Sequence, residues 1–391
     1  MKYMKTYFKI ILLVAIAGVV AILNNSCEES EGAPYISYVR VPNLEAKDSL
    51  LVAASQGRLI VIIGGNLQNT REVWFNDLKA DLQQARVTNH SVMVNVPSDA
   101  PEVITDPDKQ LKLVFADGRT LLHEFKVTIN KPVIHRIQSE YLMEGEKAII
   151  DGDYLYLPIS VTFPGGATVS SDDGGVIVEE VIVNEATNEK FMRLTVTVPS
   201  GATEPGPLTF TNNFGTTISR FWFLDNRNIF FGFDGEEGPY SAGFRVTNPG
   251  PGDPPLINGP YFRLTKTIGS WDWTQVFGWV YTSDIPEDAI LNPRKYNYKF
   301  EVNTIKPFNA NGIRIFLSDD YYDPRYFFWN GNTAQVDTNG KWQTIVFPFE
   351  EVMASNVNPG VVSSYFLGFI YCGDRTLDCD MCFDNFRIVP K

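Results

Sequence analysis

Two consecutive segments of the chain repeat the same order of strand patterns, and this internal repeat restricts the folds that the sequence can adopt. The first runs from about residue 34 to 129 and the second from about residue 132 to 224. Within each segment, apolar and polar residues alternate with a period of two between Gly, Asn and Asp turns, which is typical of antiparallel strands. Segments of roughly 90 residues with several short strands predict two β-sandwiches in tandem.

The corresponding parts of the two segments can be read side by side. They are the openings PYISYVR (34–40) and PVIHRIQ (132–138), the glycine-terminated strands RLIVIIGGN (58–66) and KAIIDGD (147–153), the Val-Pro strands SVMVNVP (91–97) and RLTVTVP (193–199), and the hairpins LKLVFADGRTLLHEFKV (111–127) and GPLTFTNNFGTTISRFWF (206–223). This order resembles the IPT/TIG immunoglobulin-like family. Modules of that family act as spacers or interaction domains, so the resemblance implies a stalk, which Pro132 would stiffen at the boundary between the repeats.

Beyond residue 225 the sequence changes character, because five of the seven tryptophans lie there. Alternating strands are predicted at 296–305, 311–319, 325–331, 341–349 and 364–373, with short helical turns near 286–290 and 349–354. This pattern over about 165 residues predicts an antiparallel jelly roll or sandwich. The opening NIFFGFDGEEG (228–238) and the ending CFDNFRIVP (382–390) resemble the edge strands of galactose-binding-like jelly rolls, which are common among carbohydrate-binding modules.

The predicted fold class is therefore all-β. We expect two tandem immunoglobulin-like (IPT/TIG) β-sandwiches at residues 28–130 and 131–224, followed by a jelly-roll-like carbohydrate-binding β-sandwich at residues 225–391.

The first 27 residues predict a targeting segment. Three lysines precede the apolar run IILLVAIAGVVAIL (10–23), and the small residue Ser26 stands directly before Cys27. This arrangement predicts a lipoprotein signal peptide with Cys27 as the lipid acceptor, and a membrane-spanning signal anchor is the alternative. The acidic run at 28–31 resembles the export signal of surface lipoproteins in the Bacteroidetes. We therefore expect a lipid-anchored protein on the outer surface of the outer membrane.

Charge and histidine content narrow the classes of function. A net charge of −13 argues against nucleic acid as a partner, because such binding needs a basic patch. No histidine lies beyond His135, so the C-terminal domain has no imidazole base. Carboxylates are frequent there, but none stands in a recognised glycosidase pattern, which needs two carboxyls roughly 5–10 Å apart. Catalysis is therefore the secondary hypothesis.

Three tryptophans gather in GSWDWTQVFGWVYTSD (269–284). If this stretch is one strand, a single face carries Trp271, Trp273, Gln275, Phe277, Trp279 and Tyr281, and the other face carries small residues that can pack inward. A flat, exposed indole suits stacking on the C–H face of a sugar ring. A core role is the alternative, but each buried indole N–H would then need a partner. We predict glycan contacts from Trp271, Trp273 and Trp279, and a core position for Phe277.

A second aromatic cluster lies in SDDYYDPRYFFWNGN (318–332). Aromatic rings beside carboxylates and an arginine could stack on sugars and bind their hydroxyl groups. We predict glycan contacts from Tyr321, Tyr326 and Trp329. The alternative is a solvated hairpin with Trp329 in the core, and Trp342 is predicted to be structural.

Cysteines and acids suggest two further features of the C-terminal domain. Cys372, Cys379 and Cys382 form either a Cys372–Cys379 disulfide with one free thiol or a buried trio of small apolar side chains. Jelly-roll carbohydrate modules often hold a structural calcium ion between their terminal strands, and this resemblance implies a site at Asp234 and Asp384. No other cofactor is expected.

The order of anchor, two IPT/TIG-like units and tryptophan-rich domain resembles the type B surface glycan-binding proteins of Bacteroidetes polysaccharide-utilisation loci, known from xyloglucan utilisation. The resemblance implies non-catalytic capture of a polysaccharide of the β-glucan, xyloglucan or mannan class beside an outer-membrane importer complex. Two alternatives remain: a glycoside hydrolase or lyase domain on an immunoglobulin-like stalk, and a surface adhesin that binds proteins.

Overall fold

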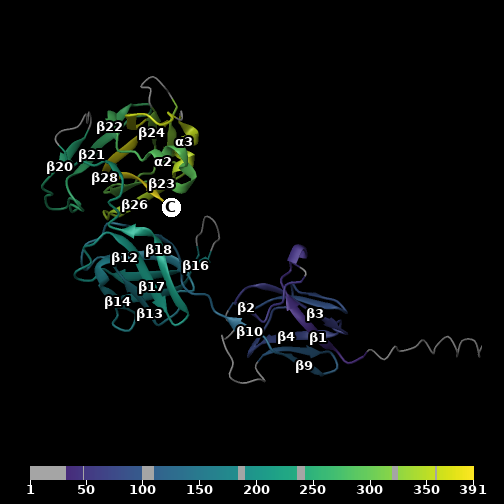
Figure 1. Ribbon diagram of the computed structural model, residues 1–391. Coiled ribbons are helices and arrows are strands. Elements are labelled where there is room, and N and C mark those ends of the chain that lie inside the picture. Colours follow the sequence, from purple (N-terminus) through teal and green to yellow (C-terminus); the bar gives the residue numbers. More distant parts are fainter. Residues whose placement is uncertain are drawn as a thin grey trace, which may run out of the picture. The chain divides into compact units, whose positions relative to one another are not determined.

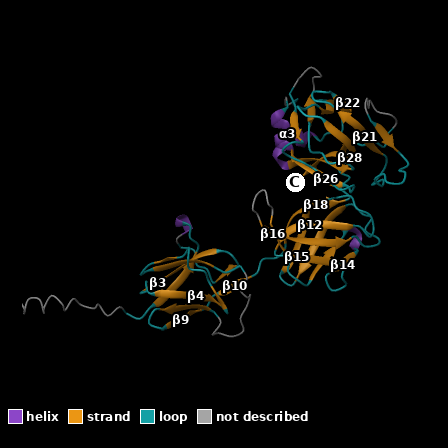
Figure 2. Ribbon diagram, turned by 180° about the vertical axis from the view of Figure 1, so that it is seen from behind, coloured by secondary structure: helices purple, strands orange, loops and turns teal. Residues whose placement is uncertain are grey.

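The computed structural model describes residues 32–46, 48–98, 110–183, 190–235, 243–318, 325–356 and 359–391 (Figures 1 and 2). The chain divides into two compact units, Met1–Asn130 and Lys131–Lys391. Strands dominate both units, so the predicted all-β fold is confirmed. Within the described ranges, no helix has the length and apolar character needed to cross a membrane.

The first unit contains one sandwich of two four-stranded antiparallel sheets. The sheet orders are β1-β3-β7-β6 and β5-β4-β8-β9, and β10 pairs with β2 in parallel. The elements are β1 (Tyr35–Arg40), η1 (Leu44–Ala46), β2 (Ala53–Ser55), β3 (Leu59–Gly65), β4 (Thr70–Phe75), β5 (Leu78–Lys79), β6 (Arg86–Val87), β7 (Ser91–Asn95), β8 (Leu111–Phe115), β9 (Thr120–His123) and β10 (Lys126–Thr128). Alternate residues such as Val92 and Val94 fill the core, as the period of two predicts.

The second unit begins with a sandwich of matching topology. Its sheet orders are β11-β12-β16-β15 and β14-β13-β17-β18. The elements are β11 (Val133–Ile137), β12 (Lys147–Asp153), β13 (Ile159–Thr162), η3 (Pro164–Gly166), β14 (Thr168–Ser170), β15 (Val176–Val183), β16 (Lys190–Thr197), β17 (Gly206–Asn212) and β18 (Gly215–Phe223). Opening strand, glycine-terminated strand, Val-Pro strand and hairpin take the same places in both sandwiches, so the predicted repeat is present in three dimensions.

A glycine stands at the same place in each sandwich, beside the opening strand, and accounts for one feature that the two repeats share. Gly64 in β3 faces the backbone of Tyr35, and Gly152 in β12 faces the backbone of Val133. An added Cβ at either glycine would overlap the carbonyl oxygen of that neighbour. Each opening strand has a β-bulge beside this glycine, so the absent side chain lets the opening strand approach closely.

The C-terminal domain, in the same unit, is a sandwich of two antiparallel sheets. The β28 sheet has the order β20-β21-β28-β23-β26, with β19 also paired to β28, and the β22 sheet has the order β22-β27-β24-β25. The elements are β19 (Ile229–Phe231), β20 (Phe244–Val246), β21 (Tyr261–Ile268), β22 (Thr274–Thr282), α2 (Glu287–Leu291), η4 (Pro293–Lys295), β23 (Tyr296–Thr304), β24 (Gly312–Ser318), β25 (Phe327–Asn330), β26 (Gln343–Pro348), α3 (Phe349–Ser355), β27 (Tyr365–Tyr371) and β28 (Leu377–Pro390). Phenylalanines fill the space between the sheets, and the ring centroid of Phe386 lies 5.0 Å from those of Phe300 and Phe369.

One expectation for this domain is wrong. The terminal segment was predicted to be an edge strand, but β28 lies in the middle of its sheet between β21 and β23. It is buried at nearly every position on both faces. One face meets the phenylalanine core, and the other contributes Arg387 to the contact with the second sandwich, so no solvent-facing edge remains.

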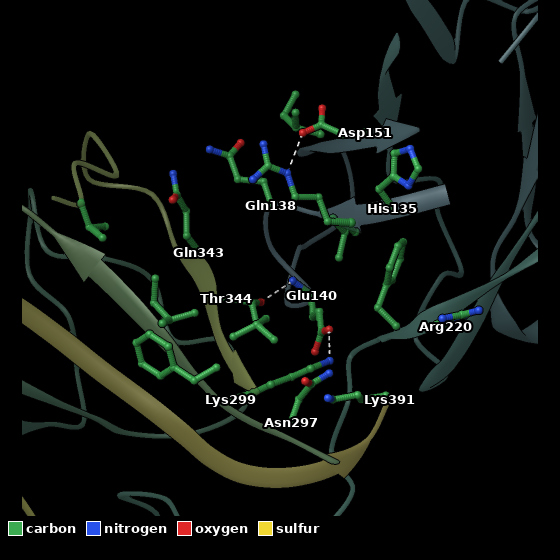
Figure 3. Close-up of a pocket in the computed structure, with 18 of the residues that line it drawn as sticks. His135, Gln138, Glu140, Asp151, Arg220, Asn297, Lys299, Gln343, Thr344 and Lys391 are labelled. Carbon is green, nitrogen blue, oxygen red and sulfur yellow. Dashed lines mark hydrogen bonds and ion pairs between the residues drawn. The ribbon is translucent and has the colours of Figure 1, made fainter. Parts of the chain in front are cut away.

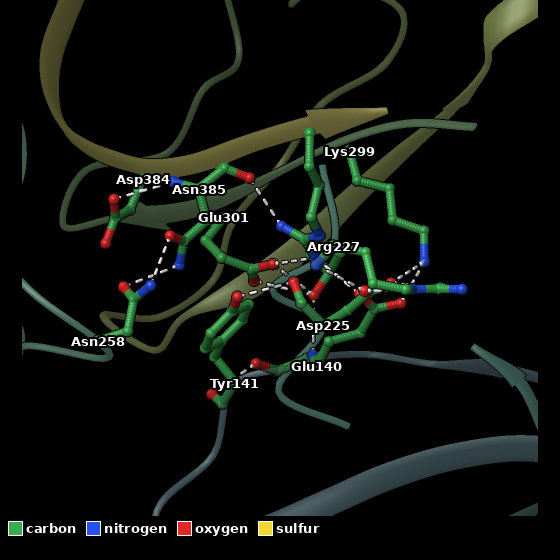
Figure 4. Close-up of polar contacts among 12 residues, drawn as sticks. Glu140, Tyr141, Asp225, Arg227, Asn258, Lys299, Glu301, Asp384 and Asn385 are labelled. Carbon is green, nitrogen blue, oxygen red and sulfur yellow. Dashed lines mark hydrogen bonds and ion pairs between the residues drawn. The ribbon is translucent and has the colours of Figure 1, made fainter. Parts of the chain in front are cut away.

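A buried ionic network joins the second sandwich to the C-terminal domain (Figure 4). Glu140, just after β11, accepts hydrogen bonds from Lys299 of β23 and from Arg387 of β28, the latter at 2.6 Å. Arg387 also donates to Glu301 at 2.7 Å. Burial raises the pKa of Glu301, while the guanidinium of Arg387 favours its charged form. Charges withdrawn from water in this way are tolerated only when each has a well-placed partner.

Backbone contacts reinforce this junction. The amide of Thr344 in β26 donates to the carbonyl of Gln138 at 3.0 Å, and the hydroxyl of Tyr141 donates to the carbonyl of Asp225 at 2.7 Å. β26 lies beside the second sandwich in both views (Figures 1 and 2). The second sandwich and the C-terminal domain therefore form one packed body.

We predict that Arg387→Met destabilises the full chain strongly. The variant leaves two buried carboxylates without their shared cation, which should lower the free energy of unfolding by about 3–5 kcal/mol. Urea unfolding followed by tryptophan fluorescence measures this. The matched control is Lys306→Met, which removes an exposed pair with Asp378 and should leave the urea midpoint nearly unchanged. Equal effects of the two variants would contradict the importance of the network.

Candidate functional site

The outer face of the β22 sheet carries aromatic side chains around one arginine. In β24, Ile313, Ile315 and Leu317 point into the core, so Arg314 and Phe316 point outward. Arg314 pairs with Ile370 of β27 on one side and with Phe328 of β25 on the other. This places Arg314 near the middle of the face.

Two rings reach Arg314 from opposite edges of the sheet. Trp273 precedes the edge strand β22, and Tyr326 precedes the edge strand β25. The guanidinium carbon of Arg314 lies 4.6 Å from the ring centroid of Trp273 and 4.3 Å from that of Tyr326. The Tyr326 ring also contacts Phe316 and Phe328, with centroids 5.6 and 6.1 Å away. We call these residues, with Trp271, the aromatic face.

The turn before β22 turns two indoles toward solvent. Trp271 is 59% exposed and Trp273 is 56% exposed. Trp271 has a φ of 60°, and its amide donates to the carbonyl of Gly373 at 2.7 Å. A left-handed backbone is unusual for a bulky residue and costs roughly 1–2 kcal/mol. The strained conformation keeps a large apolar ring in water, which a purely structural role does not require.

The predicted single aromatic face of 271–281 is wrong in its register. β22 begins only at Thr274, and its pairing with β27 shifts twice, on either side of Phe277. As a result Val276 and Phe277 are both buried, while Tyr281 is exposed. The core position predicted for Phe277 is confirmed, since its ring stacks on Phe369 at 5.5 Å. The side chain of Trp279 lies outside the described residues.

The second predicted cluster divides between core and surface. Trp329 is only 3% exposed and packs on Phe308 with ring centroids 4.7 Å apart, so it offers no free face to a sugar and its predicted glycan contact is corrected to a core role. Tyr326 belongs to the aromatic face, and Tyr321 lies outside the described residues. Trp342 is buried and donates its indole N–H to a backbone carbonyl, which confirms its structural role.

Sequence reasoning missed Arg314, Phe316 and Phe328. The signal for Arg314 was present in the alternation of GIRIFLS (312–318), where a charged residue stands between two isoleucines. Phe328 lies opposite Arg314 because β25 pairs with β24. The residues of either strand alone do not predict this pairing.

A cavity lies at the junction, between the second sandwich and the β28 sheet (Figure 3). It measures about 720 Å³. Its carboxylates are already engaged, because Asp151 accepts from Arg136 and Arg193 and Glu140 binds Lys299. The aromatic residues that line it are buried or half-buried, so they present no open flat surface like that of the two exposed indoles. We therefore place the candidate site on the aromatic face.

A buried acid marks the region predicted for calcium. Asp384 is 1% exposed, and its Oδ2 has no hydrogen-bond partner among the described residues. Burial raises the pKa of Asp384 well above its usual range, and the charge of Asp234 adds to this shift. In the described part of the chain, no group of three or more His, Cys, Asp or Glu side chains is arranged to hold a metal ion. The carboxylate oxygens of Asp234 and Asp384 are ligands of the type that calcium binds.

The structure also decides between the disulfide and the buried trio predicted for the three cysteines. Cys372, Cys379 and Cys382 are all free and buried, so the Cys372–Cys379 disulfide is wrong and the buried trio is confirmed. Cys372 follows β27 and Cys379 lies in β28, which places them on different sheets. Burial raises the pKa of Cys379 to about 12, so its thiol is protonated at neutral pH.

Residues 223–390 match the family model described as the surface glycan-binding protein B xyloglucan binding domain. Over 222 residues the chain is 23% identical to an IPT/TIG domain-containing protein of Bacteroides ovatus, covering 56% of this chain and 45% of that one. The chain thus spans about half the length of this curated relative.

A solved structure shows the same fold. The surface glycan-binding protein PbSGBP-B from Prevotella bryantii has a TM-score of 0.63 at 20% identity, with 92% of this chain and 99% of that chain covered. SGBP-B from a complex xyloglucan utilization locus in Bacteroides uniformis has a TM-score of 0.48 at 20% identity, with 92% and 100% covered. The predicted resemblance to type B surface glycan-binding proteins with IPT/TIG domains is confirmed.

We predict that the native protein resists thiol alkylation at Cys379 and Cys382. Both thiols are buried and their raised pKa values leave little thiolate at pH 8. Treatment with iodoacetamide, followed by peptide mass spectrometry, should show these cysteines unmodified in folded protein and modified after denaturation. A peptide linking Cys372 to Cys379 in unreduced protein would contradict the free thiols of the structure.

Proposed function

We propose that this chain, a relative of the type B surface glycan-binding proteins, binds a neutral β-linked glucan on its aromatic face and does not cleave it. The observation that carries the proposal is the pair of exposed indoles, Trp271 and Trp273, presented on one turn beside Arg314. The family model matched by residues 223–390 is named for xyloglucan binding, which supports a glucan as the ligand.

Stacking explains why such a face suits a polysaccharide. Sugar rings expose C–H groups on their faces, and the weakly negative faces of aromatic rings attract them. Indoles at one edge of the β22 sheet and the rings of Tyr326 and Phe328 at the other give several separate contacts for consecutive sugars. The net charge of −13 opposes the approach of a polyanion, which favours an uncharged polymer.

Two acids in the described part of the domain support binding without cleavage. Asp272, which stands between the two indoles, is paired with Lys266 at 3.2 Å. Asp384 has a raised pKa, as a general acid would, but it is enclosed in the domain where a polymer cannot reach it. A glycosidase needs two accessible carboxyls on opposite sides of the scissile bond.

The location and partners of the protein belong to the same proposal. A basic segment, an apolar run and Ser26-Cys27 support lipidation at Cys27 and attachment to the outer membrane. The protein would then hold the glycan at the cell surface beside an outer-membrane importer complex. Several anchored copies would strengthen a weak contact by avidity.

We predict that Trp273→Ala and Trp271→Gly each weaken glucan binding. Loss of a central aromatic contact should cost about 2 kcal/mol, roughly thirtyfold in Kd. Affinity gels with soluble xyloglucan, mixed-linkage glucan and mannan, followed by calorimetry on oligosaccharides, measure this. Trp271→Gly also tests strain, because glycine accepts the left-handed backbone and should keep the melting temperature unchanged.

The control variant is Phe244→Ala, which removes a 51% exposed ring from β20 on the other sheet and should bind as the wild type does. Full binding by both tryptophan variants would place the site elsewhere. Failure of the wild type to bind any of these polymers, or release of reducing ends from them, would overturn the proposed function.

Calcium at Asp384 and Asp234 remains a second part of the proposal. It is supported by the enclosed, unpartnered Oδ2 of Asp384 and by the nearby charge of Asp234. A bound calcium ion would offset the cost of burying this carboxylate.

We predict that calcium raises the melting temperature of the full chain relative to EDTA. At a concentration a hundredfold above Kd, the gain should be about 2.7 kcal/mol. Asp384→Asn should abolish the calcium-dependent shift and should be at least as stable as the wild type in EDTA, because it replaces a buried ionisable group with a neutral one. A wild type with equal melting temperatures in calcium and EDTA would exclude the site, and magnesium serves as the control cation.

A further inference from the structure

We propose that Arg314 fixes the sugar on the aromatic face by donating two hydrogen bonds to neighbouring equatorial hydroxyls of one ring, and that it thereby selects glucose over mannose in the polymer backbone. The inference rests on the proposed function, because it concerns the same face. It assigns to Arg314 the directional contact that stacking alone does not provide.

The guanidinium of Arg314 is held in place before any ligand arrives. Its carbon lies 4.6 Å from the ring centroid of Trp273 and 4.3 Å from that of Tyr326, and these rings approach from opposite edges of the sheet. Arginine stacks on aromatic faces by cation–π attraction. A long side chain fixed in this way loses little further rotamer freedom on binding.

The donors of this guanidinium are free. Among the described residues, no acceptor reaches the side chain of Arg314, and its buried Nε has no hydrogen-bond partner. The other arginines buried in this domain differ. Arg263 binds Asp253 and Asp380, and Arg387 binds Glu140 and Glu301.

Nε is buried and lies out of reach of a ligand, whereas the terminal N–H groups of Arg314 are not among the buried atoms and are open to a ligand oxygen. Because Arg314 lies near the centre of the aromatic face, a ligand bound on this face is the molecule that supplies this oxygen.

Two glycines on the face of Arg314 let neighbouring aromatic rings lie close against the sheet. The ring of Phe328 lies directly over Gly312, where an added Cβ would overlap it. Phe316 lies against Gly368 in the neighbouring strand, 3.2 Å from the position of an added Cβ. Rings laid over glycines in this way leave low relief on both sides of the guanidinium, which suits a ring lying flat.

The geometry of a flat pyranose then decides which sugar fits. Equatorial hydroxyls project outward in the plane of the ring, whereas an axial hydroxyl points along the normal to the ring. A planar guanidinium offers two N–H groups in a fixed fork, which matches two acceptors that lie in one plane. Glucose presents neighbouring equatorial hydroxyls at C2 and C3, whereas mannose has its C2 hydroxyl axial. A fork beside a flat-lying sugar therefore reaches both oxygens of glucose and one of mannose.

The test uses the full chain, two variants of Arg314 and calorimetry with cello- and manno-oligosaccharides of equal length. Arg314→Met keeps the length of the side chain and should weaken cello-oligosaccharide binding roughly thirtyfold. Arg314→Lys keeps the cation over the rings but lacks the planar fork, and should weaken binding at least tenfold. The exposed Arg294→Met is the control and should bind as the wild type does.

A deoxygenated ligand separates a hydrogen-bonding role from a structural one. Wild type should lose roughly tenfold in affinity when the C2 or C3 hydroxyl of the central glucose is removed, while Arg314→Met should lose nothing further. Wild type should also prefer the gluco- to the manno-oligosaccharide, and Arg314→Met should lose that preference. Melting temperatures establish that each variant is folded.

The outcomes separate the two proposals. If Trp273→Ala loses binding while both Arg314 variants bind and discriminate as wild type does, the glucan face stands and this inference fails. The same conclusion follows if Arg314→Met responds to deoxygenation as fully as wild type. If wild type binds no glucan at all, the proposed function itself fails.

Discussion

The side chain of Arg387 is the contact on which the arrangement of the second unit depends. It is fully buried and pairs with Glu140 from the second sandwich and with Glu301 from its own domain. A hydrophobic junction could slide by a few ångströms and remain stable, because apolar contacts are not directional. A junction of buried charges cannot slide in this way, because any displacement leaves one charge without its partner. The network therefore sets a single position of the C-terminal domain on the second sandwich.

This junction also determines which surface remains for binding. A β-sandwich has two outer faces, and here the outer face of the β28 sheet contributes Lys299, Glu301 and Arg387 to the junction. The outer face of the β22 sheet is left for other contacts, and it carries the aromatic rings. One sheet is thus specialised for attachment to the second sandwich and the other for contact with a ligand.

The sequence predicted the parts of this structure that depend on local patterns. Alternation and turn residues placed both hairpins of the repeats, the two short helices and the central strands of the last domain. Prediction from the sequence failed where the pairing of distant strands decides which side chains are buried. Two register shifts in β22 bury the neighbouring residues Val276 and Phe277 together, whereas the alternation of the sequence predicts that they lie on opposite faces. Likewise, Trp329 is drawn into the core by its neighbours in other strands, and no feature of its own segment indicates this.

The two best-placed arginines of the C-terminal domain show how a stable fold and a binding face differ in physical terms. Arg387 has carboxylate partners and no exposure, as expected of a group that stabilises the fold. Arg314 has aromatic rings beside it but no acceptor among the described residues, and the same face carries Trp271 in a strained backbone with its ring in water. An unpaired donor and a strained, exposed indole each cost free energy in the isolated protein. Sequences are locally consistent except where function requires otherwise, so the presence of two such conflicts on one face argues that this face serves binding.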